Sequence, residues 1–198
     1  MKSVYLFGQG IAQGNAKKIN LLGGKGANLA EMSKLDIPVP PGFTISTDVC
    51  NLFLKEKKIN QKIKTDINKA LLRVEKKIKK QFGDIENPLL LSVRSGAKIS
   101  MPGMMETVLN IGLTTKTIPA LINKTNNEQF VYDSYRRLIM MYADVVMEKA
   151  EQKNHIQIRE KLESILDKYK NIKNIEKDSD FSVRDLKEII VEFKKEIK

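Results

Sequence analysis

A segment in the middle of the chain combines side chains that bind phosphate with glycines that admit a ligand. The apolar run Leu89–Val93 ends in Arg94, Ser95 and Gly96, and a second loop places Gly103 between methionines. The apolar run predicts a buried strand. We expect Arg94 and Ser95 to emerge at its end, where sheet-based sites lie, and the arginine fork suits phosphate. A strand followed by two ordinary turns is the alternative, since glycine and proline mostly mark loops.

A glycine-rich loop nearer the N-terminus offers a second place for phosphate. Lys25 lies among Gly23, Gly24 and Gly26, and a helical pattern of apolar residues starts at Ala27. Such a loop presents free backbone N–H groups and the positive end of a helix dipole, and lysine adds a mobile charge. The residue order of a Walker A loop is absent. An ordinary turn with an exposed lysine is the alternative, but two such loops together favour phosphate binding.

The elements that must position these residues fall into two parts. Residues 1–112 are predicted to form an α/β unit, with a helix after the glycine loop, a strand at 43–45 following a proline-rich turn, a strand at 89–94 and an extended segment at 108–111. The basic stretch between the strands carries apolar residues at helical spacing and predicts one or two amphipathic helices. The predicted fold class is therefore α+β.

Residues 113–198 are predicted to be helical only. Apolar residues share one face over 127–150, and a second helix is predicted over 155–169. Ser182 and Asp185 have the spacing of an N-terminal capping box before another helix, with Asp in place of the usual Glu.

Four blocks of sequence keep the order and approximate spacing of a known family. They read LLGGKGANLAEM at 21–32, IPVPPGFTIST at 37–47, PLLLSVRSGAKISMPGMMETVLNIGL at 88–113 and YDSYRRLIMMYADVVM at 132–147. Together they closely resemble the N-terminal nucleotide-binding region of the pyruvate, phosphate dikinases. Phosphoenolpyruvate synthases share a GGK-type loop and a VPPGF-like segment, but they typically continue after the arginine with an acidic stretch. A fragment of such a synthase, or of a related dikinase, is the enzymatic alternative.

The resemblance implies an ATP site built from these blocks. Lys25 and Arg94 would hold the ATP phosphates and serve in catalysis, while Ser95 and Gly96 would position the next loop. That loop, Ser100–Met105, would cover the nucleotide. The implied nucleotide-binding set is Gly23, Gly24, Lys25, Gly26, Arg94, Ser95, Gly96, Ser100, Gly103 and Met105. Lys98 stands where the family often has arginine, and a lysine cannot make the bidentate fork.

The resemblance also implies a partial ATP-grasp-type domain, with 1–112 as its first α/β subdomain and 113–198 as a helical subdomain. The family converts pyruvate, ATP and phosphate to phosphoenolpyruvate, AMP and pyrophosphate through a phosphohistidine. The implied cofactors are ATP and Mg²⁺, and the implied parent is a cytoplasmic homodimer. The resemblance implies that the metal ligands, the phosphohistidine domain and the pyruvate-binding domain lie outside this chain. His155, the only histidine, does not match the phospho-acceptor position. We therefore expect the isolated chain to be inactive.

A net charge of +11 raises the alternative of a non-catalytic module that binds nucleic acid or a partner chain. Residues 55–80 alone hold 11 basic and 3 acidic groups, but such a run is usually a solvated helix face. Aromatic residues do not interleave with the basic ones, so stacking on bases lacks support. Cys50 is the only cysteine, which excludes a disulfide scaffold and fits a reducing cytoplasm. No apolar run reaches the length of a membrane span.

Overall fold

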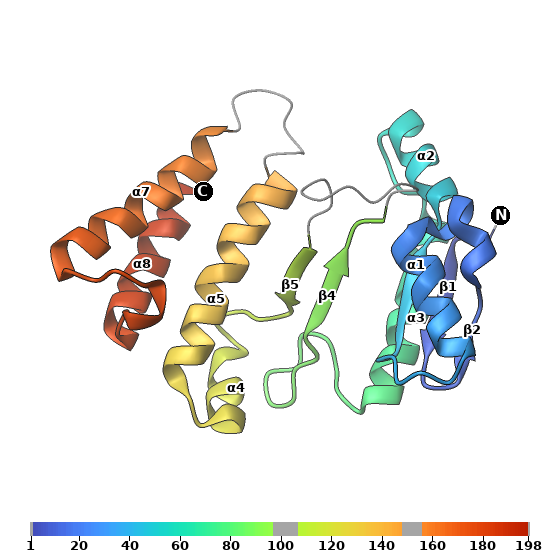
Figure 1. The fold of residues 1–198 in the computed structure, drawn as a ribbon, viewed down its shortest axis with the longest axis horizontal. Coiled ribbons are helices and arrows are strands. Elements are labelled where there is room, and N and C mark those ends of the chain that lie inside the picture. The colour runs from blue at the N-terminus through green and yellow to red at the C-terminus, as the bar shows by residue number, and fades with distance from the viewer. Residues whose placement is uncertain (1, 97–106, 148–155, 198) are drawn as a thin grey trace. The chain divides into compact units, whose positions relative to one another are not determined.

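The structure, a computed structural model, describes residues 2–96, 107–147 and 156–197. In these segments it mixes helices with a three-stranded and a two-stranded sheet (Figure 1). The predicted combination of helix and sheet is therefore confirmed. Among the helices of these segments, none is long and apolar enough to cross a membrane.

Contacts within the chain define two compact units. The first unit comprises Met1–Gln81 and Ser95–Met105, and the second comprises Phe82–Arg94 and Glu106–Lys198. This division does not coincide with the predicted boundary at residue 112, because the strands nearest that boundary group with the helices that follow them. The assignment of 1–112 and 113–198 as subdomains stays a prediction.

The first unit contains a small antiparallel sheet. Its strands are β1 (Val4–Gly8), β2 (Ile11–Ala12) and β3 (Gly42–Ile45), in the order β2-β1-β3. The tight turn between β1 and β2 uses Gln9 and Gly10, which both have positive φ, at 47° and 79°. The strand predicted after the proline-rich turn is confirmed by β3, which pairs along the length of β1.

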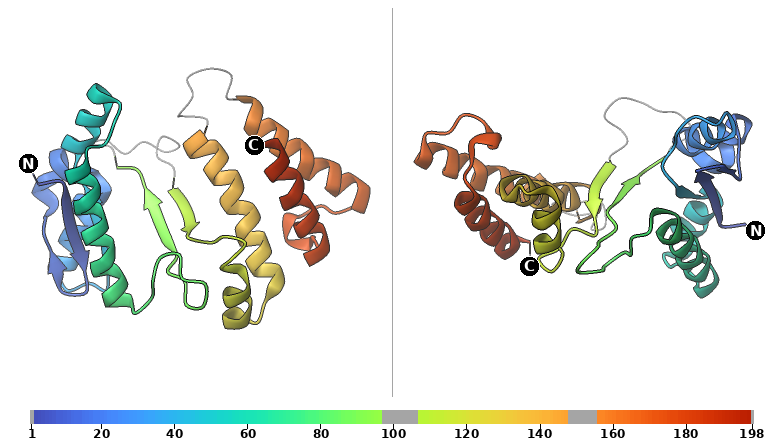
Figure 2. Two further views of the ribbon diagram at one scale, coloured as in Figure 1. Left: turned by 180° about the vertical axis from the view of Figure 1, so that it is seen from behind. Right: turned by 90° about the horizontal axis from the view of Figure 1, so that it is seen from below.

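Three helices surround this sheet. They are α1 (Ile19–Lys34), α2 (Thr47–Glu56) and α3 (Gln61–Ile78). In two views of the ribbon, α1 lies on one face of the sheet and α3 on the other (Figures 1 and 2). The side chain of Asn60 caps α3 by accepting a 3.0 Å hydrogen bond from the Ile63 N–H, which satisfies one of the free donors of a helix start.

The core of the first unit lies between these helices and the sheet. A short 3₁₀ helix, Ala16–Lys18, leads into α1. In α3 the buried residues follow the predicted helical spacing, and lysines such as Lys62 and Lys69 are exposed on its solvent side. The predicted amphipathic helix is thus confirmed. Buried apolar residues of this unit are Leu6, Leu22, Ala27, Ala30, Val39, Val49, Ile63, Ala70 and Val74.

The second unit begins with a two-stranded ribbon. Strands β4 (Leu91–Arg94) and β5 (Thr107–Ile111) pair antiparallel with an irregularity in register. Two helices follow, α4 (Ile118–Thr125) and α5 (Glu128–Tyr142), and the chain continues from α5 into a π-helical turn, Ala143–Met147. This confirms the long helix predicted from residue 127 as far as the described residues extend.

The last helix of the second unit packs on α5, and the helix before it packs on that last helix and on the π-helical turn. In chain order the elements are α7 (Ile156–Lys173), a 3₁₀ turn (Asp178–Asp180) and α8 (Val183–Glu196). The helix predicted at 155–169 is confirmed by α7, which extends four residues further. Buried apolar residues of the second unit form one core: Val108, Leu113, Ile118, Val131, Tyr135, Leu138, Ile139, Ala143, Leu162, Leu166, Tyr169, Phe181, Leu186, Ile189, Ile190 and Phe193.

The predicted capping box at the start of α8 is confirmed. The Asp185 N–H donates to the Ser182 hydroxyl at 3.2 Å, and the Ser182 N–H donates to an Asp185 carboxylate oxygen at 3.1 Å. The hydrogen bond from the Ser182 hydroxyl lowers the pKa of Asp185 from its usual 3.8; burial opposes this, and Lys173 adds to it. The carboxylate therefore stays ionised at neutral pH.

The prediction of a buried strand before Arg94 is wrong for its second half. Leu89 is buried, but Ser92 and Arg94 are exposed, and the Val93 side chain is 54% exposed. The reason is that β4 pairs with β5 alone within the described segments, so its end lies in a narrow ribbon and not inside a larger sheet.

Candidate functional site

The glycine-rich motif lies inside α1 and interrupts it. Gly23 has φ 67° and ψ 165°, which is not a helical conformation, so the helix stops and restarts there. The sequence predicted a loop followed by a helix. The structure instead has a break within a helix, because the residues before Gly23, from Ile19 on, are also helical. Gly24, Lys25 and Gly26 form the first turn after the break. The N–H groups of such a turn have no intrahelical acceptor and lie at the positive end of the dipole.

The two flanking glycines of this turn are held by packing. A Cβ on Gly26 would lie 2.7 Å from the Thr44 Cγ2 atom, so Gly26 allows α1 to approach β3 closely. A Cβ on Gly23 would lie 2.9 Å from the Gly96 carbonyl oxygen. The structure therefore brings Gly96 against the glycine-rich turn, and both residues belong to the first unit. Lys25 lies between the two glycines and is half-buried.

Arg94 occupies the last position of β4, as predicted. It is exposed and pairs with Thr107 in the ribbon. By contacts Arg94 belongs to the second unit, whereas Ser95 and Gly96 belong to the first. The chain thus passes from one unit to the other directly after this arginine.

The remaining predicted site residues lie outside the described residues. These are Ser100, Gly103 and Met105 of the implied nucleotide-covering loop, together with Lys98 and His155.

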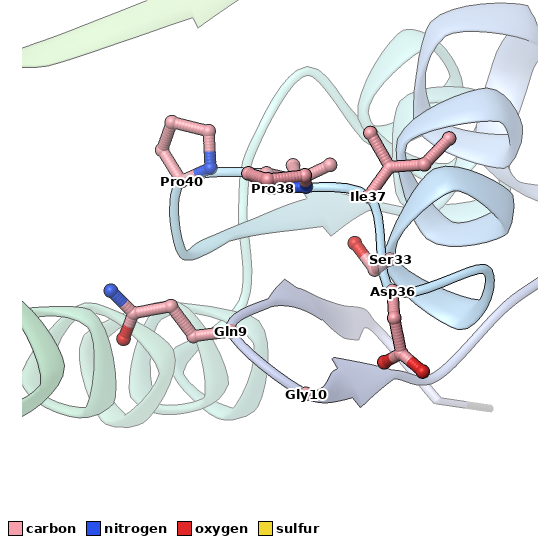
Figure 3. Close-up of a pocket in the computed structure, with 8 residues that line it drawn as sticks. Gln9, Gly10, Ser33, Asp36, Ile37, Pro38 and Pro40 are labelled. Atoms are coloured by element: carbon pink, nitrogen blue, oxygen red, sulfur yellow. The ribbon is translucent and has the colours of Figure 1, made fainter.

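A pocket of about 360 Å³ lies in the first unit, at the turn between α1 and β3 (Figure 3). Its lining residues include the polar Gln9 and Asp36 and the apolar Pro38 and Pro40. The Ser33 hydroxyl at its edge accepts from the Gly8 N–H at 2.9 Å and donates to the Leu29 carbonyl at 2.7 Å, so it is already paired. None of the predicted phosphate-binding residues lines this pocket.

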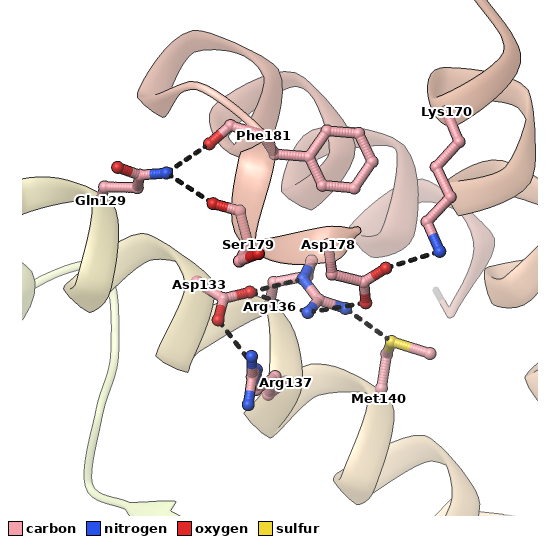
Figure 4. A network of polar contacts seen from close by, with 9 residues as sticks. All are labelled: Gln129, Asp133, Arg136, Arg137, Met140, Lys170, Asp178, Ser179 and Phe181. Atoms are coloured by element: carbon pink, nitrogen blue, oxygen red, sulfur yellow. Dashed lines mark hydrogen bonds and ion pairs between the residues drawn. The ribbon is translucent and has the colours of Figure 1, made fainter. Parts of the chain in front are cut away.

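A buried arginine in the second unit was not predicted as a notable residue. Arg136 on α5 is 2% exposed and contacts Asp133 at 2.7 Å and Asp178 at 3.1 Å (Figure 4). Lys170 of α7 pairs with the same Asp178 carboxylate at 2.7 Å. Burial alone would raise the pKa of Asp178, but the Lys170 hydrogen bond and the Arg136 charge hold this pKa below its usual value. The network ties α5 and α7 to the 3₁₀ turn before α8.

This network is structural. Its cations and carboxylates satisfy one another, and Gln129 donates to the Ser179 and Phe181 carbonyls at 2.9 Å each (Figure 4). The only local signal in the sequence is the i, i+3 spacing of Asp133 and Arg136, which many exposed helix pairs share.

A Mg²⁺ site is not assigned to this part of the chain. Divalent cations of this type bind carboxylate oxygens, and the described residues contain no group of three or more His, Cys, Asp or Glu side chains that could hold a metal. The residues that the structure describes do not form a dedicated metal cage.

Comparison with known proteins first gives the class of protein. Residues 19–70 match the family model described as the AMP/ATP-binding domain of pyruvate phosphate dikinase. This range contains the break at Gly23, the whole of β3 and α2, and most of α3. This part of the chain is thus similar in sequence to a nucleotide-binding domain.

The chain is also similar to individual enzymes that share one name. The chain is 47% identical to pyruvate, phosphate dikinase of Clostridium symbiosum over 98% of its own length and 21% of that protein. It is 42% identical to the Rickettsia conorii enzyme over 98% of this chain and 21% of the relative, and 45% identical to the chloroplastic Arabidopsis thaliana enzyme 1 over 98% and 19%. The predicted resemblance is confirmed, and the chain spans about a fifth of the length of the curated relatives it matches.

Proposed function

We propose that the chain binds ATP as the nucleotide-binding portion of a pyruvate, phosphate dikinase. The observation that carries this proposal is the helix break at Gly23, inside the residues matched by the family model. It supplies the start of a helix next to Lys25, and the N–H groups of a helix start are a favourable place for a phosphate. The backbone of Gly96, in the segment that follows β4, lies against Gly23 at this break.

Each proposed residue has a distinct task toward the triphosphate. Gly24 and Gly26 offer backbone N–H groups, Lys25 offers a compact mobile charge, and Arg94 offers two parallel donors. Phosphoryl transfer spreads negative charge over the phosphate oxygens, so positioning and cationic stabilisation supply most of the catalysis. Lys25 and Arg94 are therefore the proposed catalytic residues.

The finer assignments rest on the family resemblance. Ser95 and Gly96 position the loop that follows, and Ser100, Gly103 and Met105 of that loop cover the nucleotide. The parent has an ATP-grasp-type domain, binds Mg²⁺ through ligands outside this chain, and forms phosphoenolpyruvate from pyruvate, ATP and phosphate through a phosphohistidine. It is a cytoplasmic homodimer. The chain alone is inactive because the phospho-acceptor belongs to another domain.

The proposal is tested by titrating ATP into the purified chain by calorimetry. Lys25→Ala should weaken ATP binding by about tenfold or more, because a charge-assisted hydrogen bond contributes roughly 1.5–3 kcal/mol. Lys62→Ala is the matched control, since Lys62 is an exposed lysine on α3. Equal ATP affinity in wild type and Lys25→Ala, or equal losses in both variants, would contradict the proposal.

The same titration distinguishes the alternative of a basic binding module. Competing RNA should leave ATP binding intact if ATP occupies the helix break. RNA binding that persists in Lys25→Ala and is lost with Lys62→Ala and Lys69→Ala would instead favour a nucleic-acid-binding face on α3.

A further inference from the structure

Gly23 adopts a backbone conformation that is essentially restricted to glycine. Its φ of 67° and ψ of 165° lie in a region where a side chain would strain the backbone. This conformation breaks α1 between Leu22 and Gly24. The break alone accounts for a glycine at this position.

The surroundings of Gly23 impose a second and separate requirement. A Cβ here would lie 2.9 Å from the Gly96 oxygen, 3.0 Å from the Gly96 carbonyl carbon and 3.3 Å from the Gly96 Cα. All three neighbours are backbone atoms, so they can yield only if the segment itself moves. In the opposite direction, a Cβ on Gly96 would lie 3.7 Å from the Leu22 oxygen, which is ordinary contact. The close approach therefore depends on the absence of a side chain at Gly23.

The partner in this contact is the start of a segment with its own proposed role. Ser95 and Gly96 are the first residues that group with the first unit after β4 ends at Arg94. Gly96 is exposed whereas Gly23 is buried. The Gly23 backbone thus packs directly against the Gly96 backbone, one residue before the proposed phosphate-binding turn.

We propose that Gly23 is a positioning residue for nucleotide binding, an inference that rests on the proposed ATP site. Because Gly96 packs against the helix break, Gly23 fixes the position of the Ser95 and Gly96 backbone relative to Gly24 and Lys25. The ligand groups that depend on this geometry are the phosphates. A side chain at Gly23 displaces the backbone of Ser95 and Gly96 relative to Gly24 and Lys25, so the two segments no longer contact the phosphates together. The contacts with adenosine stay in place.

The experiment compares Gly23→Ala with Gly10→Ala in the full chain. Gly10 also has a positive φ, 79°, but a Cβ on it would meet no atom within 4 Å. Gly10→Ala therefore places a side chain at a positive φ without the steric contact. Calorimetric titrations with ATP and with adenosine are carried out below the unfolding temperature of each variant.

Gly23→Ala should weaken ATP binding by about tenfold or more, because donors displaced from the phosphates lose charge-assisted hydrogen bonds. Adenosine binding should not change, and Gly10→Ala should change neither affinity. Unchanged ATP affinity in Gly23→Ala, or an equal loss for adenosine, would overturn the positioning role while leaving the proposed ATP site standing. A wild-type chain that binds no ATP would overturn the proposed function and this role with it.

A ligand-free measurement tests the contact by itself. Hydrogen exchange at Ser95 and Gly96 should be faster in Gly23→Ala than in wild type and unchanged in Gly10→Ala, because only the first substitution displaces the Gly96 backbone. Equal exchange at these two residues in all three proteins would show that Gly23 does not position the segment.

Discussion

At the scale of single residues, the proposed site combines two cations with different chemistry. Lys25 is half-buried in the first turn after a helix break. Its compact ammonium lies on a flexible side chain and can pair with a phosphate there. Arg94 is exposed at a strand end, where its planar fork can meet two phosphate oxygens at once. These side chains are not interchangeable.

Replacement of the arginine by lysine tests this difference. Arg94→Lys keeps the charge but loses the fork, so it should weaken ATP binding nearly as much as Arg94→Ala does, by about tenfold. Arg73→Lys, at an exposed arginine on α3, is the control and should have no effect. Calorimetry gives both affinities. If Arg94→Lys bound ATP like wild type, Arg94 would be a structural residue at the strand end.

Gly26 gives a prediction about packing that is independent of any ligand. A Cβ at this position would collide with Thr44, so Gly26→Ala should lower the free energy of unfolding by about 1–3 kcal/mol. Removing the Thr44 side-chain atoms in the double variant Gly26→Ala, Thr44→Ala should recover part of this loss, which urea denaturation measures. Simple addition of the two single effects in the double variant would show that the close approach is not the cause.

At the scale of elements, the helices of the second unit are held together by polar contacts as well as by their apolar core. The buried Arg136 joins α5 to Asp178, and Lys170 of α7 joins the same carboxylate. Removing either partner of a buried ion pair leaves the other charge without compensation, which lowers the free energy of unfolding.

Arg136 should therefore be far more important for stability than the adjacent Arg137. Arg136→Leu leaves Asp133 and Asp178 without their buried partner and should cost about 3 kcal/mol in the free energy of unfolding. Arg137 pairs with the same Asp133 at 2.8 Å but is 59% exposed, so Arg137→Leu should cost less than about 1 kcal/mol. Urea denaturation followed by helical circular dichroism measures both. Similar losses would contradict the structural role assigned to the network.

The capping box of α8 gives the second unit a defined dependence on acid. The folded-state pKa of Asp185 lies below its usual 3.8, chiefly through the Ser182 hydroxyl. Its contribution to stability is thus present above pH 3.8 and is lost as the pH falls through the lowered pKa. Ser182→Ala should cost about 1 kcal/mol at neutral pH and much less in strong acid, measured by urea denaturation across this range. A loss that is independent of pH would show that the cap acts without the carboxylate.

At the scale of the whole molecule, what could be predicted depends on how far apart in sequence the interacting residues lie. The capping box of Ser182 and Asp185, the end of β4 at Arg94 and the amphipathic α3 involve residues within a few positions of one another, and their patterns predicted them. The contacts of Gly26 with Thr44, Gly23 with Gly96 and Arg136 with Asp178 join distant segments. No local pattern specifies such pairs, so the glycine motif could be recognised but the packing that fixes it could not.

The same reasoning explains why the prediction that β4 is buried along its length was wrong. An apolar run predicts burial, yet burial depends on which strands and helices cover it, and β4 has only β5 beside it within the described segments. The relatives are about five times longer than this chain, so we propose that its candidate phosphate-binding residues are one portion of a larger site.

The central claim is that ATP binds at the break in α1, and a titration of the isotope-labelled chain followed by amide NMR tests it most directly. ATP should shift the amide signals of Gly24, Lys25 and Gly26 most strongly, together with that of Gly96, because their N–H groups face or adjoin the phosphates. Signals from the pocket beside Asp36 should change little. The largest shifts at that pocket, or no shifts at saturating ATP, would contradict the account.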